Sequence, residues 1–306
     1  MKGLVLSEEY YRRFGTKMIA EKFPQYKGRI AVGLVGDGSE CYGFDDEISR
    51  DHDWGPGFCL WLTKTDYQKI GRQLQAAYDE LPKEFLGFRR LETEQGKGRV
   101  GVFEIGEFYR RFLGRSHAPK SIDAWLYLRA EAASPCTNGK VFSDPLGKFS
   151  QIREELLAFY PEDVRLLKIA GLCISCGQTG QYNFMRSVKR KEYFASQYAE
   201  TKFCADIISL IFLLNRRYSP YYKWRHRALL TLTILGDFVH TKIGRMMETS
   251  DHYTKSLIIE EISMAVIAEF KKQDLSHSGT DFLVDHATMI QRRISNPKLS
   301  EMRLWR

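Results

Sequence analysis

Two aspartates separated by one residue, Asp51 and Asp53, are the residues of this chain best suited to chemistry. If their segment is extended, both side chains point to the same side, because strand side chains alternate. Like charges held so close repel each other, and such a pair commonly binds a divalent cation. Mg²⁺ takes one or two protein carboxylates and completes its coordination with water and substrate phosphates. The spacing therefore predicts a site for Mg²⁺ or Mn²⁺ at these two carboxylates.

A glycine-serine step, Gly38 and Ser39, precedes the aspartates and follows the apolar run 30–35. The run predicts a strand, and the small residues after it let the backbone approach a phosphate closely. Together with the aspartates and Ser49, this turn predicts a site for a nucleoside triphosphate bound through its metal. The alternative is a solvated acidic turn, since Asp, Ser and Gly are common in loops.

The Gly-Ser turn after a strand, followed by Asp-x-Asp, resembles the signature of the DNA polymerase beta-like nucleotidyltransferase superfamily. The order of elements is similar to that of aminoglycoside and lincosamide adenylyltransferases. Over its whole length the chain resembles an uncharacterised bacterial family that joins such a head to a helical tail, with Tyr-Asn-Phe…Arg at 182–186 and Pro-Tyr-Tyr-Lys-Trp at 220–224. His52 and Trp54 depart from the superfamily pattern, which has aliphatic residues there.

Glu104 lies among apolar residues of a predicted strand at 99–105, and a charged residue in that setting needs a reason. In the resembling adenylyltransferases a third carboxylate on a later strand ligates the metal or accepts a proton from the attacking hydroxyl. The resemblance implies that role for Glu104, with Glu107 and Asp123 as alternatives. The structural alternative is an edge strand that points Glu104 into solvent.

Four residues of the second half are candidates for binding the triphosphate. Tyr182, Arg186 and Lys189 share one face of a helix predicted from 161 to about 191, and cations on such a face can bind phosphate oxygens. Lys223 lies among aromatic residues that can stack on a base. The alternatives are a solvated basic face for the first three and a core helix from which Lys223 extends outward.

A chain of 306 residues predicts two domains. Residues 1–120 combine short strands with helices and predict a nucleotidyltransferase-like head with a small mixed sheet. Residues 121–306 read as helices with short connections, apart from a link at 139–142, and predict a helical bundle that closes the cleft. The expected fold class is α+β, a mixed-sheet head followed by an all-α domain.

The net charge of +8 and the isoelectric point near 9.1 favour polyanionic partners. No apolar run approaches the roughly 20 residues of a membrane span, and the N-terminus becomes acidic too soon for a secretory signal. We therefore expect no membrane and a cytoplasmic location. The six cysteines include one Cys-x-x-Cys pair, Cys173 and Cys176, and are expected to be free thiols.

The combined expectation is a metal-dependent nucleotidyltransferase that uses ATP. An acceptor hydroxyl would attack the α-phosphorus in line and release pyrophosphate. A small-molecule acceptor is the first expectation, by resemblance to the antibiotic adenylyltransferases, and a tRNA or protein acceptor is the second. The alternative of another class is a catalytically silent nucleotide sensor.

Overall fold

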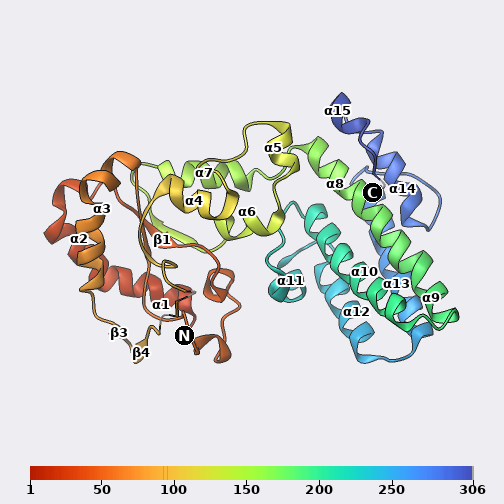
Figure 1. Cartoon of the computed structure of the whole chain (residues 1–306), viewed down its shortest axis with the longest axis horizontal. Coiled ribbons are helices and arrows are strands. Elements are labelled where there is room, and N and C mark those ends of the chain that lie inside the picture. The colour runs from red at the N-terminus through yellow and green to blue at the C-terminus, as the bar shows by residue number, and fades with distance from the viewer. Residues whose placement is uncertain (92, 95, 305–306) are drawn as a thin grey trace. The chain divides into compact units, whose positions relative to one another are not determined.

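The computed structural model describes residues 1–91, 93–94 and 96–304 (Figure 1). Contacts divide the chain into two compact units. The sheet unit comprises residues 1–120 and 127–158, and the helical unit comprises residues 121–126 and the chain from 159 onward.

The sheet unit is built on four strands in the order β5-β2-β1-β6. β1 is antiparallel to both of its neighbours, whereas β2 and β5 are parallel. The strands are β1 (Ala31–Leu34), β2 (Cys59–Leu62), β5 (Gly101–Glu104) and β6 (Lys140–Ser143), and a separate small hairpin pairs β3 (Glu84–Phe85) with β4 (Phe88–Arg89). Every residue of β1 and β2 is buried, because both faces of the sheet are covered.

Helices cover the two faces with different side chains. One face carries Leu60 and Leu62, which belong to the same core cluster as Tyr10, Met18 and Leu74 of the first three helices. On the other face the ring of Trp61 stacks on that of Phe149 at 3.8 Å between centroids. The helices of this unit are α1 (Gly3–Tyr10), α2 (Thr16–Lys22), α3 (Lys64–Asp79), α4 (Ile105–Leu113), α6 (Ala130–Thr137) and α7 (Lys148–Leu157), with a π-helical turn at Tyr11–Gly15 between α1 and α2.

The boundary at residue 120 that the sequence predicted is wrong for one segment. The segment 139–142, which read as a link between helices, largely belongs to β6 (Lys140–Ser143), which pairs with β1. This pairing joins residues 127–158 to the sheet unit. A four-residue strand at a sheet edge is too short to show a period, so it was indistinguishable from a turn in the sequence.

The helical unit contains the remaining helices. Within it α8 packs against α10 and α14, and α12 packs against α13. Its helices are α5 (Ile122–Leu126), α8 (Glu162–Cys176), α9 (Met185–Lys189), α10 (Tyr193–Leu214), α11 (Tyr222–Ala228), α12 (Gly236–Glu248), α13 (His252–Lys272), α14 (Leu283–Gln291) and α15 (Pro297–Ser300), with a π-helix at Gly177–Phe184 between α8 and α9. The expected α+β class, a small mixed sheet with a helical part, is confirmed.

Two further expectations bear on the whole chain. In the part that the structure describes, no helix combines the length and apolar character needed to cross a membrane. All six cysteines are buried free thiols, as expected.

Candidate functional site at one edge of the sheet

Strand direction brings four loops to one edge of the sheet. β1 ends where its antiparallel neighbour β2 begins, with Gly33 opposite Cys59. The parallel strand β5 begins at the same edge, with Gly101 beside Cys59, and β6 begins there with Lys140 beside Leu34. The loops that follow β1 and precede β2, β5 and β6 therefore meet, and we call this place the loop edge.

The glycine-serine turn after β1 is fixed by the loop that precedes β6. The side-chain oxygen of Asn138 accepts from the Gly36 amide at 3.1 Å, and its nitrogen donates to the Gly36 carbonyl at 2.7 Å. Gly36 has φ of +143°, a conformation in which a side chain would be strained. Ser39 then opens a short 3₁₀ helix (Ser39–Tyr42). The turn predicted to approach a phosphate is thus held in place at the loop edge.

Asp51 and Asp53 do not lie on a strand, so the prediction that they point the same way from extended backbone is wrong. Asp51 has helical backbone angles, φ −65° and ψ −33°, and Asp53 has a positive φ of +53°. β2 begins only at Cys59, because the intervening segment contains Pro56 and Gly55, the latter at φ +131°.

The Asp53 carboxylate links the loop before β2 to the loop before β5. Its side chain is only 2 % exposed and accepts from the Thr93 amide at 2.9 Å and the Thr93 hydroxyl at 2.7 Å. An Arg99 nitrogen lies 4.0 Å from it. Burial alone would raise the pKa of Asp53, but the bonds from Thr93 and the charge of Arg99 outweigh it, and the net pKa is lowered. Asp53 is therefore held ionised.

A glycine makes room for this carboxylate. A Cβ at Gly96 would lie 1.8 Å from Asp53 Oδ1. The loop before β5 can therefore close on Asp53 only because residue 96 has no side chain.

Asp51, in contrast, faces solvent. Its side chain is 60 % exposed, and His52 Nδ1 lies 2.7 Å from its Oδ1. Ser49, which the sequence placed near the nucleotide, instead bonds within its own turn, because its hydroxyl and amide both donate to Asp46 at 3.1 Å.

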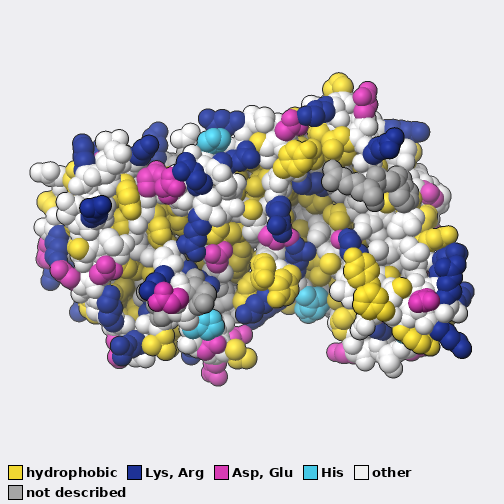
Figure 2. Space-filling model, in the orientation of Figure 1, with side chains coloured by type: hydrophobic (Ala, Val, Ile, Leu, Met, Phe, Trp, Pro, Cys, Tyr) yellow, Lys and Arg dark blue, Asp and Glu magenta, His cyan; other side chains and the backbone are white. Residues whose placement is uncertain are grey.

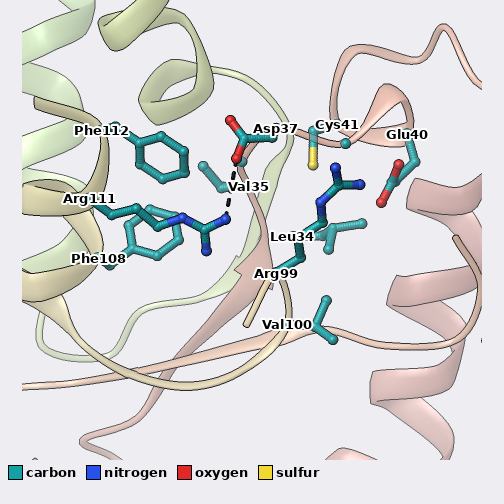
Figure 3. A pocket seen from close by; sticks show the side chains of 12 residues that line it. Leu34, Val35, Asp37, Glu40, Cys41, Arg99, Val100, Phe108, Arg111 and Phe112 are labelled. Atoms are coloured by element: carbon teal, nitrogen blue, oxygen red, sulfur yellow. Dashed lines mark hydrogen bonds and ion pairs between the residues drawn. The ribbon is translucent and has the colours of Figure 1, made fainter. Parts of the chain in front are cut away.

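A narrow pocket at the loop edge brings together charged residues that the sequence did not single out (Figure 3). Arg111 reaches Asp37 at 3.3 Å and donates to the Gly98 carbonyl at 2.6 Å. Arg99 and Glu40 line the same pocket as Gly38. The one signal for Arg99 in the sequence was its position at the start of a predicted strand. Arg111 belongs to α4, and its place depends on how that helix packs.

Glu40 is a second buried acid of the loop edge. It is 6 % exposed, and burial raises the pKa of its carboxyl, although the charges of Arg90 and Arg99 oppose that rise. A Cβ at Gly38 would lie 2.4 Å from this carboxylate. A side chain at position 38 would therefore displace the Glu40 carboxylate.

Glu104 lies at the opposite edge of the sheet from the aspartates. It is the last residue of β5 and pairs with Leu62, three residues or about 10 Å along the strand from the loop edge. Its carboxylate caps α4 by accepting from the amides of Gly106 and Glu107, each at 2.8 Å. The structure thus does not bring Glu104 to the aspartates, because parallel pairing places its end of β5 elsewhere.

The alternatives for a third carboxylate are also engaged elsewhere. Glu107 pairs with Arg110 on α4, and Asp123 of the helical unit binds Lys298 at 2.7 Å. Among residues 1–91, 93–94 and 96–304, no group of three or more acidic, histidine or cysteine side chains could hold a metal.

The two aspartates alone still offer the type of ligand atom that Mg²⁺ prefers. Mg²⁺ prefers carboxylate oxygens and needs only one or two of them when phosphates and water supply the rest. Thr93 gives one hydrogen bond to each oxygen of Asp53, whereas a carboxylate can accept about four. Asp51 presents its carboxylate to solvent and is open to a hard cation, whereas the Asp53 side chain is only 2 % exposed.

The predicted phosphate-binding residues of the second half all lie in the helical unit and are exposed. Tyr182 is in the π-helix and Arg186 in α9, and the guanidinium lies 4.6 Å from the Tyr182 ring centroid. Lys189 ends α9, and the Lys223 amine lies 5.0 Å from the Trp224 ring centroid. The single helix predicted from 161 to about 191 is interrupted by the π-helix.

Comparison with known families gives one match. Residues 125–225 are similar to a family described as Domain of unknown function (DUF4037). The matched stretch includes Tyr182, Arg186, Lys189 and Lys223 but not the loop edge. No curated protein matches the chain.

Proposed function

We propose that the sheet unit binds a nucleoside triphosphate, ATP in the first instance, together with Mg²⁺ at the loop edge, and transfers its nucleoside monophosphate to a hydroxyl acceptor. The observation that carries this proposal is that Arg99, which lines the same pocket as Gly38, lies 4.0 Å from the Asp53 carboxylate. A turn that admits a phosphate and two carboxylates suited to Mg²⁺ are the parts that such a site requires.

Each residue has a defined part in this proposal. The turn at Gly38 and Ser39 receives the phosphate oxygens, and the charges of Arg99 and Arg111 in the same pocket as Gly38 offset those of the triphosphate. Asp51 and Asp53 hold the metal, which would neutralise charge on the phosphate oxygens when bound. The acceptor hydroxyl attacks the α-phosphorus in line, its proton passes to water, and pyrophosphate leaves as the bond from the α-phosphorus to the bridging oxygen breaks. Glu104 takes no part in this proposal.

A small-molecule hydroxyl compound is the acceptor that we propose first, and a tRNA is the second. The net charge of +8 suits a polyanionic acceptor.

One observation favours a second candidate, a nucleotide-binding module without catalysis. The third carboxylate expected from the resembling enzymes is engaged in capping α4. Without a base to accept the hydroxyl proton, the loop edge would bind nucleotide without turning it over.

The test measures ATP binding with and without Mg²⁺ by calorimetry. We expect the double variant Asp51→Asn/Asp53→Asn to lose Mg²⁺-dependent binding. Glu47→Gln is the matched control, because it removes an exposed acid of the same segment and should bind as the wild type does. Unchanged binding in the double variant would contradict the proposal.

A second measurement separates the two candidates. The protein is incubated with α-labelled nucleoside triphosphates, Mg²⁺ and cell extract, and the label is followed into small molecules, RNA and protein. Transfer that depends on Asp51 supports the enzyme. Tight ATP binding without transfer to any fraction supports the silent module.

A further inference from the structure

The hairpin of α9 and α10 carries an exposed set of cations and aromatic rings at its turn. We call this set, Lys189, Arg190, Lys191, Tyr193 and Phe194, the hairpin tip. Phe194 is 85 % exposed and Tyr193 is 60 % exposed. Two adjacent rings left in water form an apolar patch beside three cations, which is a combination suited to a ligand.

Backbone hydrogen bonds fix the turn that holds these residues. The amide of Lys191 donates to the Val188 carbonyl at 2.9 Å, and that of Glu192 donates to the Ser187 carbonyl at 3.0 Å. Lys191 itself has φ of +63°, which a residue with a side chain adopts only where its surroundings require it. The cations and rings are therefore presented by an ordered turn.

The charge of the segment is strongly positive. Residues 182–198 contain four cations, Arg186 and the three of the tip, and a single acid, Glu192. Among the described residues, none forms an ion pair with Lys189, Arg190 or Lys191. Figure 2 shows basic side chains gathered at the right-hand end of the helical unit, where α9 lies in Figure 1. Their charge is thus left for a partner.

Rings continue along both helices away from the tip. On one side the Arg186 guanidinium lies over the ring of Tyr182. Tyr182 precedes Lys189 by seven residues, or about 10 Å of helix. On the other side Tyr198 is 61 % exposed, five residues or about 7 Å from Tyr193. Cations and rings therefore extend over a length that exceeds a single nucleotide.

We propose that the hairpin tip binds single-stranded nucleic acid. Bases stack on Phe194 and Tyr193, and phosphates pair with Lys189, Arg190 and Lys191. Aromatic platforms flanked by cations are how proteins bind single strands, because every base has a face to stack and every nucleotide a charge. A lone small molecule would need a concave pocket, whereas the tip is an exposed turn. This proposal does not rest on nucleotide binding at the loop edge, so either can fail alone.

The experiment measures binding of the full chain to fluorescent single-stranded oligonucleotides of about 12 residues, oligo(U) and oligo(dT), by anisotropy. We expect Tyr193→Ala/Phe194→Ala to weaken binding at least about fivefold for each lost stack. Phe194→Tyr keeps a ring and should bind as the wild type does. Tyr127→Ala is the control, since it removes an equally exposed ring of the sheet unit.

A salt titration tests the cations separately. Each phosphate contact on a single strand contributes about 0.7 to the slope of log affinity against log salt, so Lys189→Gln/Arg190→Gln should lower the slope by about 1.4. Lys271→Gln, an exposed lysine near the end of α13, should leave it unchanged. Circular dichroism checks that the variants fold.

The outcomes divide clearly. Binding of oligo(U) or oligo(dT) that depends on both the rings and the cations supports the proposal. The oligonucleotide that binds more tightly shows whether the natural ligand is RNA or DNA. Duplex bound as tightly as single strands, or no loss in the double aromatic variant, overturns it. Binding of the tip to anionic lipid vesicles without binding to oligonucleotides also overturns it.

Discussion

The carboxylates at the two edges of the sheet have different surroundings. At the loop edge, Asp53 and Glu40 are buried among loops from four strands and lie close to Arg99. At the other edge, Glu104 caps the helix that follows its own strand. The difference shows that strand direction decides which acids can act together. Acidic residues that look alike in the sequence become part of a buried cluster or a local helix cap according to the end of the strands at which they lie.

The largest effect should come from Asp53 itself. Asp53→Ala leaves the Thr93 amide and hydroxyl without their buried acceptor and puts alanine at a positive φ. We expect a loss of about 2–4 kcal/mol in the free energy of unfolding, measured by urea denaturation. Asp51→Ala, at an exposed position, should change it by no more than about 0.5 kcal/mol. Equal losses for the two variants would contradict the contrast between a buried and an exposed aspartate.

A smaller effect is expected at the opposite edge. Glu104→Ala removes the acceptor for two amides of the first turn of α4 and should cost about 1 kcal/mol of unfolding free energy. It should leave Mg²⁺–ATP affinity unchanged, as measured by calorimetry. Glu107→Ala, whose carboxylate is exposed on α4, is the control for stability. A large loss of ATP affinity in the Glu104 variant would show that Glu104 takes part in nucleotide binding, and it would contradict the contrast between the two edges.

The third effect should be visible as a dependence on pH. Because the pKa of buried Glu40 is raised, the native state holds more protons than the unfolded state between the ordinary pKa of glutamate and the raised one. Unfolding free energy should therefore fall as pH rises through that window. Glu40→Gln should remove this fall, and urea denaturation over a pH series measures it. The control Glu47→Gln, at an exposed position, should keep the wild-type dependence of unfolding free energy on pH. If Glu40→Gln also kept it, the raised pKa of the Glu40 carboxyl would be contradicted.

Several elements were predictable because their signal is local. The apolar run before Gly36 gives β1, and Thr63 followed by a helical pattern gives α3, with Thr63 accepting from the Asp66 amide. The turn at Gly38 was located for the same reason, since small residues after a strand mark a close backbone approach.

Other features could not be predicted, because they depend on contacts between distant segments. The buried state of Asp53 requires Thr93, forty residues away, and the fixed turn at Gly36 requires Asn138. The interruption of the helix by the π-helix likewise left no period to detect in the sequence.

The sequence by itself determined that a mixed-sheet part is followed by a helical part, the strands and helices with strong periods, and the pair of aspartates with a Gly-Ser turn before them. Only the tertiary structure decided that β2 and β5 run parallel, that Asp53 is enclosed while Asp51 is exposed, and that Glu104 lies at the far edge. The physical reason is that hydrophobic periods are recorded over a few neighbouring residues, whereas strand order and the partners of a buried charge are set by packing between segments far apart in the chain.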